Sequence, residues 1–316
     1  MLRIATRGSL LALWQARHVA DALVAAHNGP APTLEIVITT GDRVTDVPLT
    51  QIGERGIFTR ELDIAILSRR ADCGVHSLKD LPTTLPDGLV IAAILEREDA
   101  RDAWLAADGV TRLREIPRGA RVGTSSLRRR ALLHATRPDL DVVDVRGNLD
   151  SRLEKLSRGH CDAMILALAG IRRIGRESVV TEALDATSWI PAPGQGAIAV
   201  VARTDDHAVR QQLRILDHSQ TATAVLAERT LLRTLEGGCQ VPIGAFATVS
   251  EHEIILHAVV ADPDAPRTVR GMLTGPRSEP EALGIALAHS MLEDGAGKIL
   301  QRLRAAGATF LAVSPP

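Results

Sequence analysis

One local pattern occurs twice along the chain and constrains the fold more than any other feature. Residues 3–10 and residues 121–127 each give a short apolar strand that runs through Thr into Ser and then into a helix. A helix end that feeds a strand also occurs twice, at residues 67–72 and 156–162. This repetition predicts two α/β lobes of similar plan, and the cleft between such lobes is the usual place for a ligand.

The order of elements after these repeats predicts the rest of the organisation. Residues 190–194, Ile-Pro-Ala-Pro-Gly, look like a linker that crosses between the lobes, and an apolar strand follows at 197–202. A long helix, two strands and a helical tail at 281–305 predict a third, smaller α+β domain. We expect the first lobe at 1–96 and 197–214, the second lobe at 97–196 and the C-terminal domain at 215–316.

Composition and charge exclude several classes of protein. The 316 residues are 45% hydrophobic, which supports a globular core, and the formal net charge of −1 gives no basic field for nucleic acid. Aromatic residues make up 2% of the chain and tyrosine is absent, so base-stacking surfaces are not expected. We find no signal-type apolar segment, no apolar run of membrane-spanning length, no paired cysteine motif and no metal-ligand spacing. We therefore expect a soluble cytoplasmic protein without a nucleic-acid, membrane or metal partner.

The second copy of the repeat carries a candidate anion site. Thr124, Ser125 and Ser126 end a strand just before a helix whose first turn holds Arg128 and Arg129. Free backbone N–H groups and the positive end of the helix would meet the arginine forks at one place. The alternative is an ordinary Ser N-cap followed by solvated arginines.

Further arginines follow the ends of other predicted strands. Arg146 ends a strand before Gly147, Arg152 lies in the next helix, and Arg173 follows a third strand exit at 169–173. Because strand ends in a parallel sheet share one edge, these arginines would converge on the cleft. Each arginine taken alone could equally be a surface residue.

A third motif places an acid beside a lysine where a buried strand emerges. Lys79 and Asp80 follow the strand that ends near His76. A carboxylate in this position suits proton transfer or stabilisation of a cation. The alternative is a surface ion pair before a proline turn, and His76 is more simply read as a structural histidine.

The fourth motif is a cysteine in a glycine-rich loop. Cys239 follows Gly237 and Gly238, so its thiol can project from the backbone as a nucleophile or an attachment point. The alternative is a buried inert thiol, which describes Cys73 and Cys161 better because both lie in apolar strands.

Together these motifs resemble one known family. Five segments, spread in order over most of the chain, are similar to porphobilinogen deaminases: residues 5–9, 75–80, 123–129, 146–148 and 236–242. The resemblance implies two lobes like those of periplasmic binding proteins, with a central cleft, and a smaller C-terminal α+β domain. It implies a transferase of porphyrin and heme biosynthesis. Such an enzyme condenses four porphobilinogen molecules head to tail, with loss of ammonia, and releases hydroxymethylbilane, a linear tetrapyrrole, by hydrolysis.

The resemblance also implies a cofactor and a set of site residues. Cys239 would carry a dipyrromethane primer through a thioether, and Asp80 would be the catalytic residue that stabilises the electron-poor cation left by ammonia. Always-charged arginine forks suit the acetate and propionate of each pyrrole ring. The residues that would bind cofactor and substrate are Arg7, Ser9, Lys79, Thr124, Ser125, Ser126, Arg128, Arg129, Arg146, Arg152, Arg173 and Gln195. The chain would act on porphobilinogen as a monomer.

The loop from Gly41 to Gly56 holds most of the departures from the family pattern. It carries charges and glycines with little periodicity, and we expect it to move as a lid over the cleft. Glu54 stands where glycine is common, and Arg55 stands where lysine is common; Arg60 likewise replaces a frequent lysine. The lid contacts are therefore open, whereas the core motifs are unaffected.

Two other functions remain compatible with parts of the pattern. A non-catalytic two-lobe receptor for a polycarboxylate would explain the arginines, but it would leave Cys239 and the third domain unexplained. A cysteine-dependent acyl or amidine transferase would need a base near the thiol, and none is evident in the local sequence.

Overall fold

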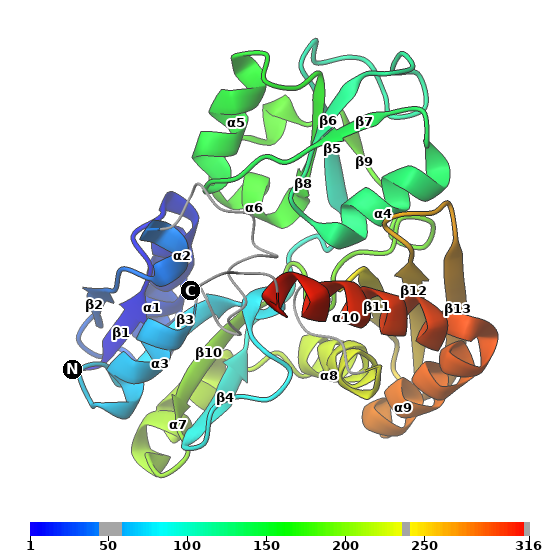
Figure 1. Ribbon diagram of the computed structural model, residues 1–316. Coiled ribbons are helices and arrows are strands. Elements are labelled where there is room, and N and C mark those ends of the chain that lie inside the picture. The colour runs from blue at the N-terminus through cyan, green and yellow to red at the C-terminus, as the bar shows by residue number, and fades with distance from the viewer. Residues whose placement is uncertain (44–58, 236–240, 313–316) are drawn as a thin grey trace.

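Three β-sheets organise the part of the chain that this computed structural model describes, which is residues 1–43, 59–235 and 241–312. Two sheets have five strands and the third has three. In Figure 1 the first lobe carries the blue and cyan strands together with the yellow-green strand β10, the second lobe is green to teal, and the orange and red C-terminal elements lie beside both. The chain is therefore a mixed α/β protein with two lobes and a smaller C-terminal domain.

The first sheet has the strand order β2-β1-β3-β10-β4. Strands β1, β2 and β3 are parallel, whereas β10 runs antiparallel to both of its neighbours. The strands are β1 Arg3–Thr6, β2 Thr33–Ile36, β3 Cys73–Ser77, β4 Leu89–Ile94 and β10 Ile198–Arg203. The accompanying helices are α1 Leu10–His27, α2 Thr40–Arg43, α3 Arg60–Leu67, η2 Leu78–Asp80, α7 His207–Leu213 and η4 Arg214–Leu216.

The second sheet repeats this plan in the order β7-β6-β8-β5-β9. Here β6, β7 and β8 are parallel, and β5 runs antiparallel to both neighbours, as β10 does in the first sheet. The strands are β5 Asp102–Ala106, β6 Arg121–Gly123, β7 Asp141–Val143, β8 Ala163–Ala167 and β9 Glu182–Ala183. The helices are α4 Leu127–Thr136, α5 Leu149–Ser157, α6 Leu168–Arg173 and η3 Glu177–Val179. The common strand order confirms the predicted pair of similar lobes.

The chain crosses between the lobes twice. The first crossover joins β4 to β5 and the second joins β9 to β10, so each lobe receives its antiparallel strand directly after a crossing. Both crossing strands are buried along their whole length. The crossovers are therefore tied into the two cores rather than lying over the surface.

The C-terminal domain is an antiparallel sheet covered by helices. Its strands are β11 Ile243–Val249, β12 Glu253–Ala261 and β13 Thr268–Pro276, and its helices are α8 Ser219–Thr234, α9 Pro280–Met291, the short π-turn η5 Leu292–Ala296 and α10 Gly297–Ala312. Leu231, Leu256 and Met291 are fully buried in one core between the sheet and the helices. The tail predicted as one helix is interrupted at Gly295, because this residue has a φ of +100°, which a right-handed helix does not allow.

Local capping explains where helices α1, α4 and α5 begin. The side chains of Ser9, Ser126 and Asn148 accept backbone N–H groups at the starts of α1, α4 and α5. These contacts satisfy donors that would otherwise lack partners in the first helical turn. The Thr-to-Ser turns of the repeat therefore work as helix caps in both lobes.

Three local predictions were wrong in detail. Residues 169–173 belong to helix α6 rather than to a loop, because an apolar run does not by itself distinguish strand from helix. Strand β7 ends at Val143, so Arg146 lies three residues beyond the strand that it was predicted to end. Cys161 is fully buried but precedes β8 instead of lying within it.

Candidate active site

Helix α4 begins with the Ser N-cap that the sequence suggested, followed by two arginines that are buried. The Ser126 Oγ accepts the backbone N–H of Arg129 at 3.4 Å, and the Ser125 hydroxyl donates to the Val145 carbonyl at 2.7 Å. Ser126 is thus an N-cap, but the arginines after it are not solvated, since Arg128 is 3% exposed and Arg129 is 5% exposed. Two buried guanidinium groups at a capped helix start require an anion nearby.

That anion within the protein is Asp102, the first residue of β5. Asp102 is fully buried; its Oδ2 lies 2.8 Å from Arg128 Nη1 and its Oδ1 lies 2.7 Å from Arg129 Nη2. Burial opposes ionisation of Asp102, but the two guanidinium charges outweigh it and hold its pKa well below the usual range. Burial also lowers the pKa of Arg128. Asp102 was not predicted from the sequence, because it directly follows the charged run at 96–101 and gives no local sign of burial.

Gln195 links this group to the other lobe. Its amide nitrogen donates to Asp102 Oδ1 at 2.8 Å and to the Ala100 carbonyl at 2.8 Å, and its Oε1 accepts from Lys79 Nζ at 3.3 Å. Burial lowers the pKa of Lys79 to about 8; the charges of Arg129 and Arg128 act in the same direction, and those of Asp80 and Asp102 oppose them. Lys79 therefore lies among charges from both lobes.

Asp80 ends the short turn η2, directly after β3. It is partly buried, and its charge acts on Lys79 and on Arg152 of helix α5. The Asp80 carboxylate is thus within electrostatic reach of cations from both lobes. Lys79 and Asp80 are both partly buried, so they differ from the exposed surface ion pair considered from the sequence.

Helix α5 carries Arg152, and the loop before this helix carries Arg146. Gly147 has a φ of +113°, which turns the chain so that Arg152 Nε donates to its carbonyl at 2.9 Å. Lys155 Nζ donates to the Arg146 carbonyl at 2.9 Å. Burial lowers the pKa of Arg152 to about 10, and the neighbouring charges of Arg129 and Arg146 add to this effect. The guanidiniums of α4 and α5 therefore form one group of mutually repelling cations.

The predicted residues Arg7, Ser9 and Arg173 follow strands β1 and β8. Arg7 and Ser9 follow β1, which is parallel to β3, so their turn lies on the same sheet edge as Asp80. Arg173 Nη2 donates to the Gly196 carbonyl at 2.6 Å, and its guanidinium lies 5.7 Å from the centre of the Trp14 ring. Burial lowers the pKa of Arg173 to about 10. The structure thus places Arg173 between helix α1 and the second crossover.

This donor set fits a ligand rich in carboxylates. Arg152 and Arg173 are held by backbone carbonyls, and burial disfavours the charge of both. Arg128 Nε is buried and has no hydrogen-bond partner within the described residues. An anion bound here would restore the free energy lost by burying these cations. The dipyrromethane implied by the sequence, with acetate and propionate on each ring, has the matching chemistry.

Two predicted features lie outside the described residues. Cys239 falls in segment 236–240, between α8 and β11, and most of the predicted lid falls in segment 44–58. The lid residues Glu54 and Arg55 belong to that second segment. Their roles stay predictions from the sequence.

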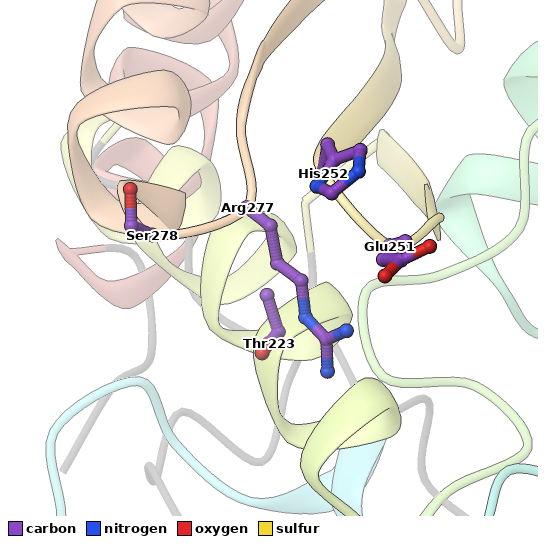
Figure 2. Close-up of a pocket in the computed structure, with 5 residues that line it drawn as sticks. All are labelled: Thr223, Glu251, His252, Arg277 and Ser278. Atoms are coloured by element: carbon purple, nitrogen blue, oxygen red, sulfur yellow. The ribbon is translucent and has the colours of Figure 1, made fainter.

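A separate hollow of about 470 Å³ opens on the C-terminal domain. Figure 2 shows that Arg277 extends toward Thr223 of helix α8, while Glu251 and His252 lie on the other side of the hollow. No residue of this hollow was predicted as a site residue. The hollow carries charges of both signs and is distinct from the arginine group.

The fold and the donor set define a class, which is a two-lobe α/β protein that binds a ligand with many carboxylates. Family models place the chain more narrowly: residues 2–211 match the porphobilinogen deaminase dipyrromethane cofactor binding domain, and residues 222–293 match the porphobilinogen deaminase C-terminal domain. A porphobilinogen deaminase of Desulforudis audaxviator is 50% identical over 302 residues, which cover 96% of this chain and 97% of that protein. The chain belongs to the porphobilinogen deaminase family.

Family membership confirms the activity predicted from the sequence. The chain is a transferase of porphyrin and heme biosynthesis with hydroxymethylbilane synthase activity, and its cofactor is dipyrromethane. None of the helices in the described ranges is long and apolar enough to cross a bilayer.

Solved structures give a more distant likeness. A periplasmic binding protein of Salmonella typhimurium with high arginine specificity has a TM-score of 0.40 and 10% identity, over 70% of this chain and 93% of that chain. Immunogenic lipoprotein A from Vibrio vulnificus has a TM-score of 0.42 and 12% identity, over 70% of this chain and 97% of that chain. The family assignment rests on the family models and the sequence relative.

Proposed function

We propose that Asp80 is the catalytic carboxylate and that Cys239 carries the dipyrromethane cofactor through a thioether. The cofactor, when bound, supplies the pyrrole end to which the substrate is joined. Loss of ammonia from porphobilinogen leaves an electron-poor cation, and a fixed carboxylate at the end of β3 stabilises that charge as it develops. Asp80 also accepts hydrogen bonds from pyrrole N–H groups in this proposal.

The cations around Asp80 take the carboxylates of cofactor and substrate. In the second lobe, the forked donors of Arg128, Arg129 and Arg152 bind these carboxylates. In the first lobe, Arg7 and Ser9 bind them. Lys79 adds one compact charge next to Asp80. The remaining contacts in this proposal come from Thr124, Ser125, Arg146, Arg173 and Gln195. Ser126 contributes through the cap that fixes Arg129.

The observation that carries this proposal is the group of buried and partly buried arginines whose charges burial disfavours. Arg152 and Arg173 have pKa values lowered to about 10, and the bonds described for their guanidiniums go to backbone carbonyls rather than to carboxylates. Burying such a group of cations costs folding free energy unless a bound polycarboxylate neutralises their charge. A receptor would need the same cations, but a receptor would not need Asp80 among them.

The domain boundaries and the assembly also belong to the proposal. We assign residues 1–96 and 197–214 to the first lobe, 97–196 to the second lobe and 215–316 to the C-terminal domain. We also propose that the chain acts on porphobilinogen as a monomer, without nucleic acid. Free, buried Cys73 and Cys161 are compatible with a reducing compartment such as the cytoplasm.

Intact mass spectrometry of the purified chain tests the attachment site. We expect an excess mass of two pyrrole rings, and we expect Cys239→Ser to lack it and to convert no porphobilinogen. The Cys73→Ser chain, altered at a buried thiol, is the matched control and should keep the excess mass. A Cys239→Ser chain that still carries the pyrroles would refute this attachment.

A further inference from the structure

Asp102 was not predicted as a site residue, yet it is the point where the anion-binding arginines meet both crossovers. We propose that Asp102 is a positioning residue for this reaction. Its carboxylate fixes the guanidinium forks of Arg128 and Arg129 and, through Gln195, sets their spacing to Lys79 beside the catalytic carboxylate. The proposal rests on the function proposed above for the arginine group and Cys239.

Both oxygens of Asp102 are fully used by named donors. Oδ1 accepts from Arg129 Nε at 3.1 Å, from Arg129 Nη2 at 2.7 Å and from Gln195 Nε2 at 2.8 Å. Oδ2 accepts from Trp189 Nε1 at 3.0 Å and pairs with Arg128 Nη1 at 2.8 Å. Five donors around one fully buried carboxylate leave it a single orientation.

Backbone carbonyls hold the guanidiniums as well, for Arg129 through a further nitrogen and for Arg128 through the same Nη1 that pairs with Asp102. Arg129 Nη1 donates to the Ile165 carbonyl of β8 at 2.9 Å, and Arg128 Nη1 donates to the Ile190 carbonyl at 3.0 Å. Each fork is therefore held between Asp102 and a backbone carbonyl, so its direction is set by the sheet and by the second crossover. One carboxylate shared by two cations leaves an excess of positive charge for a ligand.

Gln195 connects the hydrogen-bond network of Asp102 to the first lobe. It lies in the second crossover, is 1% exposed, and joins Asp102 on one side to Lys79 on the other. Asp102 itself directly follows the first crossover. The two crossovers thus converge on one carboxylate, which is fully buried, so its effect on the ligand passes through Arg128, Arg129 and Lys79.

The test replaces Asp102 by its neutral isostere, Asp102→Asn, in the full chain. We expect the fraction of folded chains that carry the cofactor, measured by intact mass, to fall by at least about tenfold, because two buried cations lose their shared counter-ion. Glu228→Gln is the matched control. It also neutralises a fully buried carboxylate paired with an arginine, but its described contacts include none of the site cations.

A second readout separates positioning from general damage. Lys79 is one of three lysines in the chain, so its reductive methylation can be followed by peptide mass against exposed Lys298 in the same sample. The groups that act on Lys79 are Asp80, Arg129, Asp102 and Arg128. In a Cys239→Ser background, which keeps all chains free of cofactor, Asp102→Asn should lower the pH of half-maximal Lys79 reactivity below about 8.

The outcomes decide the proposal in each case. Normal cofactor loading in folded Asp102→Asn, or an equal loss in Glu228→Gln at a matched melting temperature, would reduce Asp102 to a structural role. A shift of Lys79 reactivity toward the ordinary lysine range would report a loosened site and count against positioning. If Asp102→Asn does not fold, the same two measurements are made on Gln195→Ala. Normal cofactor loading together with unchanged Lys79 reactivity in Gln195→Ala would overturn the proposal. Pyrroles retained on Cys239→Ser would instead refute the attachment site.

Discussion

Arg97 and Glu228 form a buried ion pair that joins the lobes to the C-terminal domain. Arg97 Nη1 lies 2.6 Å from Glu228 Oε1, and Glu228 on helix α8 is fully buried. The Glu228 carboxylate also accepts the backbone N–H groups of Gly194 and Ala247, and Arg97 Nε donates to the Gln195 carbonyl. The first crossover, the second crossover and strand β11 therefore meet at one carboxylate.

This arrangement predicts a stability effect, because the Glu228 carboxylate holds Arg97 and two backbone N–H groups and contacts none of the proposed site cations. Glu228→Gln should lower the free energy of unfolding by about 2–4 kcal/mol, because it leaves the buried Arg97 guanidinium without its counter-ion. Denaturant unfolding followed by circular dichroism measures this change. Glu154→Gln, in an exposed pair with Arg158, is the control and should change the free energy of unfolding by less than about 1 kcal/mol. Equal stability of the Glu228→Gln and wild-type chains would contradict the prediction.

Asp80→Asn should lower the turnover of porphobilinogen without preventing cofactor assembly. The amide keeps the shape of the side chain but removes the negative charge, so turnover of porphobilinogen should fall by about a hundredfold to a thousandfold. The melting temperature and the cofactor mass should stay close to those of the wild-type chain. Steady-state assays with intact mass spectrometry of the same sample check both statements. Near-normal turnover would remove Asp80 from its catalytic role.

Arg152→Leu should stall elongation or block cofactor assembly, because it removes a partly buried fork from the carboxylate-binding group. We expect at least about a tenfold loss, either in the loaded fraction or in product formation. Arg158→Leu is the matched control because Arg158 caps the same helix α5 but its side chain is exposed. Unaffected product formation by Arg152→Leu would exclude Arg152 from the site. We expect the same result for Arg146→Leu.

Lys79 gives a pH dependence whose sign follows from its pKa. Burial lowers this pKa from 10.5 to about 8, so in the cofactor-free chain Lys79 loses its proton in the folded state before it does so in the unfolded state. Its contribution to stability therefore rises with pH between those two values. Carboxylates prefer the protonated amine, so the affinity for porphobilinogen should fall as the pH rises through about 8.

Calorimetric titration of porphobilinogen into the cofactor-free Cys239→Ser chain checks this expectation. Lys79→Arg should abolish the loss of affinity above pH 8, because a guanidinium stays charged there. An affinity that does not change with pH in the Lys79 chain would show that this amine does not contact the ligand carboxylates.

Local sequence rules predicted much of the candidate site. The Thr-to-Ser turns predicted the starts of helices α1 and α4, since a hydroxyl before an apolar helical pattern caps the first free N–H groups. The repeated plan of the lobes and the arginines of α4 and α5 were also visible in the sequence. Helix α6 and the break at Gly295 were not, because an apolar run alone does not set helix or strand, and a single glycine does not state its φ.

The pairing inside the site was decided only by the tertiary structure. Asp102 is 27 residues from Arg129 and 93 residues from Gln195 along the chain. The chain must pass through both crossovers and place β5 beside β8 before these groups meet. The sequence by itself determined which residues carry charge and where helices begin, because those depend on near neighbours. Which charges are buried together depends on the path of the whole backbone, and no local pattern records that path.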